Sequence, residues 1–352
     1  MPLRVLFLLT DLEIGGTPRV VRDLAIRLRC PEIATAVACV APWGPVAGEL
    51  SQAGVRIFPL RATQYWELPR VVSDVVRIAR GYDVVFSFLM HANAVAAVAS
   101  HWRKGDTRFI QSIQTTQSWP AWHWWMQGIV ERAAGRIVVP SASVAQAAAD
   151  YSSIDSSKIV VIPNAIDVDA FAQLPPSDSG AWHRLGFIGR LDPVKRVPDL
   201  VRAIAKVQGV ELHIYGDGED RANIEQTIKE VNVADRVTLH GRIPSPFEAL
   251  KQIDTLVLPS EAEGFGIVLI EAMAAGRSVI ATDVPGIRDV VRHNHTGLLV
   301  PVRSPDAIAS AIQRLLDDAP LRDRLRLQAI THVRTNYEWE NVIEKYRELL
   351  LG

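Results

Sequence analysis

Cysteine is almost absent from this chain of 352 residues, in which only Cys30 and Cys39 occur, without a CxxC or Cys/His spacing. This scarcity argues against a disulfide framework and against a structural zinc site, and it favours a reducing, cytoplasmic compartment. Neither sign of charge dominates, because 38 basic side chains balance 39 acidic ones to a formal net charge of -1. The composition therefore gives no support to a general nucleic-acid binder.

Long hydrophobic runs are scarce as well. Residues 84–102 lack Asp, Glu, Lys and Arg over a stretch of nearly membrane-spanning length, but His91 and Asn93 lie in its middle. A buried strand followed by a small-residue helix from about Asn93 fits this stretch better than a transmembrane span. The apolar residues 1–10 lack a small-residue cleavage site and lead into a Gly-containing turn, which predicts a buried strand rather than a signal peptide.

Short β-branched or leucine-rich runs alternate with amphipathic segments along most of the chain, which predicts an α/β fold with parallel sheets. A Pro/Ser/Gly-rich stretch at residues 173–180 interrupts the alternation and predicts a linker. Two doubly wound, Rossmann-like domains are therefore expected, with a ligand site in a central cleft that both sheets face. The expected strands are 4–9, 35–40, 56–60, 84–89, 108–113 and 136–139, then 182–188, 211–215, 236–240, 255–258, 278–281 and 297–300.

Two loops carry residues suited to phosphate. Gly15 and Gly16 follow the first strand and precede a helix expected over 18–29, so that backbone N–H groups at the helix start can face an anion. Taken alone, this segment fits a tight strand-to-helix turn better. Arg190 and Lys195 follow the strand at 182–188, where a guanidinium fork and a mobile ammonium group suit phosphate oxygens, although a solvated basic loop is the usual alternative.

The most informative segment runs from Pro259 to Gly276. A Gly-Phe-Gly turn opens a helix expected over 267–275, which Gly276 closes. Glu263 lies on the loop and Glu271 within the helix, and both carboxylates can accept hydrogen bonds from sugar or ribose hydroxyls. Two surface glutamates at a helix start are the alternative, which the glycines on both sides of Phe265 weaken, because such a loop is costly without a ligand.

The spacing Glu263-x7-Glu271 within Ser-x-x-Glu-Gly-Phe-Gly…Glu-Ala-Met-Ala-x-Gly resembles that of retaining glycosyltransferases of family 4, which have the GT-B fold. Other segments resemble the family in the same order, densely in the second half of the chain and thinly in the first. They are Gly15-Gly16, 161–167, Gly189-Arg190-Leu191 with Lys195, 215–218, His240-Gly241 and 283–286. The resemblance implies an acceptor-side domain over 1–170, a nucleotide-sugar domain over 171–335, and a helix over 336–352 that crosses back.

The resemblance also implies a role for each site residue. Arg190 and Lys195 would bind the diphosphate, Glu263 the sugar and Glu271 the ribose, and His91 would reach the transferred sugar. Catalytic roles are thereby expected for His91, Glu263, Arg190 and Lys195. Further donor contacts are expected from Gly15, Gly16, Asn164, Arg242, Ile243, Gly264, Phe265, Gly266, Ile267 and Val268.

These roles imply a hexosyl transfer (EC 2.4) with retained anomeric configuration, from a UDP-sugar or less commonly a GDP-sugar to a hydroxyl of a glycan or lipid-linked acceptor. No Asp-x-Asp motif stands where the other glycosyltransferase fold would hold a metal, so no metal or further cofactor is expected. Polysaccharide, glycan or glycolipid synthesis is the expected setting, for a monomer or homodimer. An epimerase or hydrolase of the same fold and a catalytically silent sugar-nucleotide binder are the alternatives.

Three features depart from the family pattern or add to it. Pro18 stands where the family often has glutamate, and Arg196 stands where it commonly has glycine, which adds positive charge near the phosphates. Four tryptophans lie within residues 119–125. They can seat an apolar acceptor or touch the inner face of a membrane peripherally, or they can simply pack at a helix start.

Overall fold

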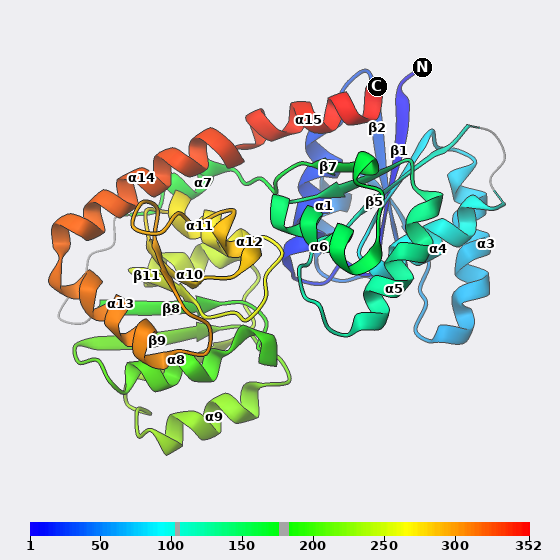
Figure 1. Ribbon diagram of the computed structural model, residues 1–352. Helices are drawn as coiled ribbons and strands as arrows, with labels where there is room; N and C mark the ends of the chain where they lie inside the picture. The colour runs from blue at the N-terminus through cyan, green and yellow to red at the C-terminus, as the bar shows by residue number, and fades with distance from the viewer. Residues whose placement is uncertain (103–105, 176–182) are drawn as a thin grey trace. The chain divides into compact units, whose positions relative to one another are not determined.

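The computed structural model describes residues 1–102, 106–175 and 183–352, and the chain divides into two compact units (Figure 1). Unit 1 comprises residues 1–164 and 342–352, and unit 2 comprises residues 165–341. Each unit contains one parallel sheet, of seven strands in unit 1 and six in unit 2. The predicted linker over 173–180 lies outside the described residues from position 176 onward.

The sheet of unit 1 has the strand order β3-β2-β1-β4-β5-β6-β7. The chain thus builds outward in one direction from β1 and then, after β3, in the other, which is the doubly wound pattern. The strands are β1 (Leu3–Leu9), β2 (Ile33–Cys39), β3 (Arg56–Pro59), β4 (Val84–Phe88), β5 (Arg108–Ser112), β6 (Arg136–Val139) and β7 (Ile159–Val161). The helices are α1 (Gly16–Arg27), α2 (Val46–Gln52), α3 (Leu68–Ala79), α4 (Met90–Ser100), α5 (Ala121–Val130), α6 (Ala142–Ser152) and most of α15 (Trp339–Leu351), with 3-10 turns η1 (Tyr65–Glu67), η2 (Glu131–Ala133) and η3 (Ser156–Lys158).

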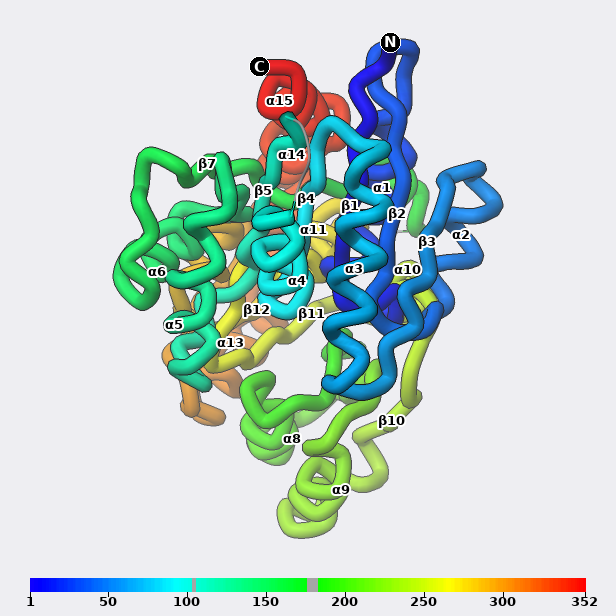
Figure 2. Tube along the Cα trace, turned by 90° about the vertical axis from the view of Figure 1, so that its right-hand side faces the viewer, coloured from blue at the N-terminus to red at the C-terminus, as the bar shows by residue number. Residues whose placement is uncertain are grey.

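Both faces of this sheet are covered. Helices α3, α4 and α5 cover one face and lie in front of the strands in Figure 2. Alternate strand residues divide between the faces, so that Leu6 and Leu8 pack with α3 and α4. Phe86 points the other way and packs against Tyr346 of α15, with ring centroids 6.3 Å apart. The central strand β4 is buried along its whole length for this reason, whereas the edge strands β3 and β7 are partly exposed.

The sheet of unit 2 has the order β10-β9-β8-β11-β12-β13 and shows the same reversal. Its strands are β8 (His183–Ile188), β9 (Val210–Tyr215), β10 (Val237–Gly241), β11 (Thr255–Leu258), β12 (Ser278–Thr282) and β13 (Leu298–Val300). Its helices are α7 (Val168–Ala172), α8 (Val197–Ile204), α9 (Arg221–Glu230), α10 (Pro246–Gln252), α11 (Ile267–Ala274), α12 (Pro285–Arg288), α13 (Pro305–Asp317) and α14 (Ala319–Tyr337), with the 3-10 turn η4 (Pro193–Lys195). The doubly wound α/β fold predicted from the sequence is confirmed.

The chain passes from unit 1 to unit 2 at residues 164/165 and returns at 341/342. On the unit 2 side these two passages are hydrogen-bonded together. The Ile166 N–H donates to the Tyr337 carbonyl at 2.9 Å, and the Val168 N–H donates to the Glu338 carboxylate at 3.1 Å. None of the helices in the described residues has the length and apolar character needed to cross a membrane.

Candidate active site

The loop between β11 and α11 is built by glycine. Gly266 caps α11 with φ +78, a left-handed conformation that glycine adopts without a steric penalty. Gly276 closes the same helix with φ +65, and its N–H donates to the Met273 carbonyl at 3.0 Å. Phe265, between Gly264 and Gly266, is buried and meets Tyr337 edge-on, with ring centroids 5.4 Å apart. The predicted Gly-Phe-Gly turn and helix therefore occur where the spacing placed them.

This loop brings Glu263 to Lys195, 68 residues earlier in the chain. The Lys195 ammonium donates to Glu263 Oε1, to which Ser260 Oγ also donates at 3.3 Å. The side chains of Lys195 and Glu263 are 18% and 15% exposed. A second link joins the two loops, because the Glu261 N–H donates to the Val194 carbonyl at 2.7 Å. A cation and a carboxylate suited to diphosphate and sugar are thus side by side.

Arg190 and Glu271 lie differently from this pair. The Arg190 side chain is 75% exposed and forms an ion pair with Asp192 at 2.6 Å. Glu271 is only 2% exposed and lies in the second turn of α11. A guanidinium in solvent can move to an arriving phosphate, whereas the Glu271 carboxylate is held within the protein. The backbone N–H groups of Ile267 and Val268 belong to the first turn of α11.

Strands β8, β9 and β10 lie on one side of β11 in the parallel sheet, so their carboxyl ends lie along the same edge as this loop. The Leu191 N–H donates to the Asp217 carbonyl at 3.1 Å, and the Gly216 N–H donates to the Gly241 carbonyl at 2.8 Å. A Cβ at Gly216 would lie 1.8 Å from the Gly189 carbonyl oxygen, so only glycine fits there. Arg242 directly follows β10, and its guanidinium is 4.0 Å from the Asp217 carboxylate. Ile243, the other residue expected near the base, comes next.

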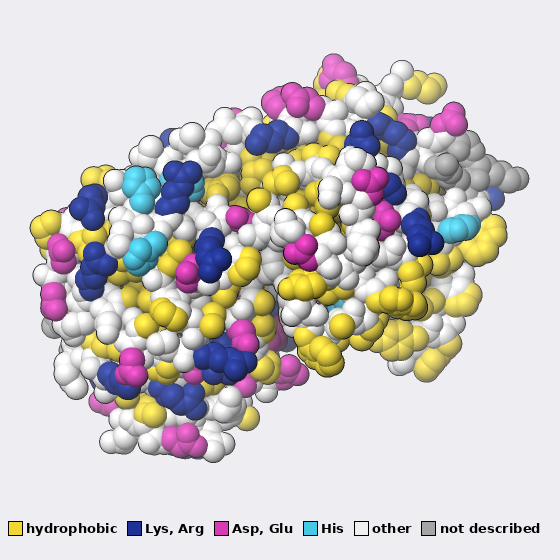
Figure 3. All heavy atoms as spheres, in the orientation of Figure 1, with side chains coloured by type: hydrophobic (Ala, Val, Ile, Leu, Met, Phe, Trp, Pro, Cys, Tyr) yellow, Lys and Arg dark blue, Asp and Glu magenta, His cyan; other side chains and the backbone are white. Residues whose placement is uncertain are grey.

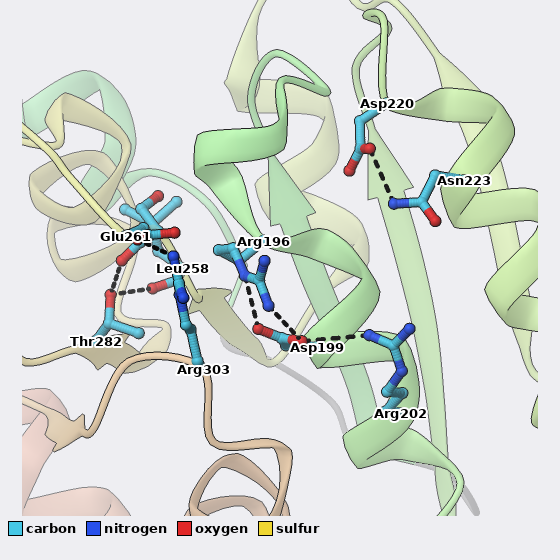
Figure 4. A network of polar contacts seen from close by, with 10 residues as sticks. Arg196, Asp199, Arg202, Asp220, Asn223, Leu258, Glu261, Thr282 and Arg303 are labelled. Carbon is cyan, nitrogen blue, oxygen red and sulfur yellow. Dashed lines mark hydrogen bonds and ion pairs between the residues drawn. The ribbon is translucent and has the colours of Figure 1, made fainter. Parts of the chain in front are cut away.

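Arg196 and Glu261 are held by ion pairs around these loops (Figure 4). Arg196 has φ +55, which explains why the family commonly has glycine there, and its guanidinium donates to Asp199 at 2.9 and 3.2 Å. Arg202 donates to the same carboxylate at 3.3 Å. Glu261 accepts from Arg303 at 2.6 Å. The positive charge that Arg196 was expected to add near the phosphates is therefore held in an ion pair with Asp199, which Arg202 shares.

The expected residues of unit 1 lie at two helix starts and at the passage to unit 2. Gly15 is the N-cap of α1, without a side-chain cap, and Gly16 is its first residue, two positions before the expected start at 18. His91 is the second residue of α4 and is exposed. Asn164 is 3% exposed, and its Nδ2 donates to Gln114 Oε1 at 3.3 Å.

Strain and a buried polar network fix the start of α4. Leu89, its N-cap, has φ 70 and ψ 155, a region that costs a non-glycine residue of order 1–3 kcal/mol and is often found at functional sites. Below it, Asn93 Nδ2 donates to the Ser112 carbonyl at 3.1 Å and to Gln127 Oε1 at 3.2 Å, and Ser87 Oγ donates to Asn93 Oδ1 at 2.8 Å. Such satisfied networks are rigid.

Sequence reasoning missed a second histidine beside His91. His123 of α5 meets it with ring centroids 6.3 Å apart, and Trp122 packs on His123 at 4.0 Å. Burial, followed by the charge of His91, lowers the pKa of His123. The only signal in the sequence was its place in the tryptophan cluster. That cluster divides, because Trp124 is buried while Trp119, Trp122 and Trp125 are exposed.

Comparisons with known proteins match both units. Residues 14–170 match the family model "Glycosyltransferase Family 4", and residues 183–332 match "Glycosyl transferases group 1". N-acetyl-alpha-D-glucosaminyl L-malate synthase of Bacillus anthracis is 34% identical over 165 residues, which is 46% of this chain and 43% of that protein. D-inositol 3-phosphate glycosyltransferase of Nocardia farcinica is 32% identical over 248 residues, which is 62% of this chain and 53% of that protein. The chain thus spans about half the length of these curated relatives.

Solved structures agree on the fold. Anabaena HepE in complex with UDP-glucose superposes with a TM-score of 0.91 at 21% identity and covers 99% of both chains. A sucrose-phosphate synthase from Thermosynechococcus elongatus superposes with a TM-score of 0.80 at 22% identity and covers 98% of both chains. The fold is therefore GT-B. With its two family models matched in order along the two units, the chain belongs to glycosyltransferase family 4.

Proposed function

We propose that this protein is a retaining, metal-independent glycosyltransferase that moves a hexose from a nucleotide-diphosphate sugar, with UDP favoured over GDP, to a hydroxyl acceptor. The observation that carries the proposal is the contact between Lys195 and Glu263 at the loop before α11. Family membership supports the reaction class. The UDP-glucose complex of Anabaena HepE supports the choice of donor.

The reaction breaks the bond from the anomeric carbon to the diphosphate and forms a bond to the acceptor oxygen. Negative charge develops on the leaving diphosphate, so that preorganised cations and N–H donors lower the barrier. Lys195, with Arg190 moving in from solvent and the first N–H groups of α11, supplies them. Attack on the face from which the diphosphate leaves retains the configuration, and the acceptor proton passes to the departing diphosphate.

Glu263 has a binding role in this proposal. Its carboxylate accepts hydrogen bonds from sugar hydroxyls, while the diphosphate becomes a second anionic partner for Lys195. Glu271 holds the ribose hydroxyls, Arg242 and Ile243 flank the base, and Gly15, Gly16, Asn164 and the loop 264–268 complete the donor contacts. His91 touches the transferred sugar. The acceptor is a glycan or a lipid-linked sugar, a choice supported by the likeness to the lipopolysaccharide core glycosyltransferase of Rhizobium meliloti, which is 32% identical over 162 residues.

A panel of UDP- and GDP-sugars tests the proposal. Selective donor binding should raise the unfolding temperature, and release of nucleotide should require an acceptor and should persist in EDTA. The product should keep the anomeric configuration of the donor in its NMR spectrum. Tight binding without release for any acceptor would instead indicate a silent binder, and release without an acceptor would indicate a hydrolase.

A further inference from the structure

Unit 1 contains a large groove on the face covered by α3, α4 and α5. Its volume is about 1520 Å³, more than the ~300–1,000 Å³ typical of a small-molecule pocket. The helices supply its apolar walls, with Leu68, Val72 and Val76 from α3, Val95 and Val98 from α4, and Met126 from α5. Figure 3 shows hydrophobic side chains gathered on the surface over these helices. Exposed apolar patches of this kind on a single chain mark binding sites.

The groove is elongated. Helices α3 and α4 both follow strands of a parallel sheet, so they run in the same direction, and the lining residues repeat every fourth position along each. From Met90 to Ser100 the rise of α4 spans about 15 Å, and Trp102 follows its end. A linear chain fits this shape better than a compact ring.

The two ends of the groove differ in chemistry. His91, Thr10, Thr63 and Gln64 line the end at the start of the helices, where polar groups can bind hydroxyls. The other end is lined by Trp102, Arg77 and Arg80. An indole and two guanidinium groups suit the headgroup level of an anionic bilayer.

We infer that this groove binds the apolar chain of a lipid acceptor, with the sugar hydroxyl at His91 and the chain leaving past Trp102. The groove is continuous with His91, so its occupant is expected to be a substrate rather than a regulatory partner. Arg80, beside the Arg77–Asp74 ion pair, adds positive charge at the exit, which complements the anionic surface in which such a lipid resides. The inference rests on the proposed glycosyl transfer and names its acceptor class.

The test measures the affinity of alkyl glucosides from hexyl to dodecyl by calorimetry, below their micelle concentrations. Each added methylene that enters the groove should lower the dissociation constant roughly two- to fourfold. Val98→Asp places a charge on the exposed groove wall and should weaken dodecyl glucoside binding at least tenfold. Ile129→Asp changes an equally exposed residue of α5 outside the groove and should leave binding within about twofold.

A second pair of variants separates the groove from simple membrane contact. Trp122 lines the groove and Trp125 does not, although both are exposed on α5. Trp122→Ala should therefore weaken dodecyl binding severalfold and Trp125→Ala should not. Equal losses in both variants would overturn the proposal in favour of surface contact. Affinity independent of chain length would overturn it outright. If the wild type sediments as a dimer and Val98→Asp as a monomer that keeps its lipid affinity, the groove is a dimer interface and the proposal is also overturned.

The same samples report on the proposed function separately. Stabilisation by UDP-glucose should be unchanged in all four variants, because none of them alters the donor loops. A protein that binds dodecyl glucoside and no nucleotide sugar would refute the glycosyl transfer while leaving the groove intact. A protein that transfers sugar equally well to hexyl and dodecyl glucosides would refute the lipid-binding role of the groove and leave the proposed glycosyl transfer standing.

Discussion

Lys195 and Arg196 are adjacent cations to which the structure gives different partners. Lys195 reaches Glu263 on the loop before α11, whereas Arg196 turns back to Asp199 in the first turn of α8. The backbone at Arg196 is left-handed, with φ +55. Two neighbouring cations therefore meet different partners, and we expect only Lys195 to bind the ligand. Sequence alone predicted a cationic loop but could not distinguish these two uses.

Arg196→Gly tests this division. The variant removes an ion pair but relieves a positive φ, and it restores the residue common in the family. Donor turnover should stay within about threefold of the wild type, because the Arg196 guanidinium is already held by Asp199. Nucleotide release under saturating donor measures this, and a loss of tenfold or more would assign Arg196 to the phosphates.

Loops at the carboxyl ends of strands are the elements that build the proposed donor site. The loop before α11 depends on α12, because a Cβ at Gly286 would lie 2.1 Å from the Glu263 carbonyl oxygen and 2.6 Å from that of Gly264. The 283–286 segment of the family pattern thus supports the glutamate loop from behind.

Gly286→Ala should displace this loop and weaken donor binding at least tenfold. Gly48→Ala is the matched control, since Gly48 lies in α2 with open space around its Cβ and alanine favours a helix by up to about 1 kcal/mol. Calorimetric titration with UDP-sugar measures both. Donor affinity that is unchanged in Gly286→Ala would mean that the loop does not need this support.

Sequence patterns predicted the elements well where burial is continuous. Strands β6 and β11 occur at the expected residues, and the other expected strands differ by one or two positions at one or both ends. Strand β7 (Ile159–Val161) was not among the expected strands; it is a three-residue edge strand and is partly exposed. The Lys195–Glu263 contact and the groove could not be read from the sequence, because distant segments meet in each.

At the scale of the whole molecule, the chemistry divides between the units. Unit 2 holds the cationic loops and glutamates, and unit 1 holds His91 and the apolar groove. Histidines with shifted pKa values occur in both units. Burial lowers the pKa of several histidines, namely His123, His183, His213, His240 and His332.

This distribution predicts that stability falls on mild acidification. The folded-state pKa values of these histidines lie below about 6.5, so the unfolded chain binds more protons as the pH falls through that value. Their contribution is complete above that pH and is lost below it. Thermal unfolding should therefore occur at lower temperature at pH 6 than at pH 7.5, and His332→Gln should reduce the difference. An unfolding temperature that rises on acidification would contradict this account.

The central claim, that Lys195 binds the diphosphate of a nucleotide sugar during transfer, is tested most directly by acceptor-dependent nucleotide release from Lys195→Ala. Release should fall by roughly 10²–10³-fold, as for the loss of one preorganised charge-stabilising donor, while the unfolding temperature stays close to that of the wild type. Lys206→Ala is the control, because Lys206 is also a lysine in an ion pair, with Asp306 at the surface of unit 2, and its release should be normal. Near-normal release from Lys195→Ala would contradict the account.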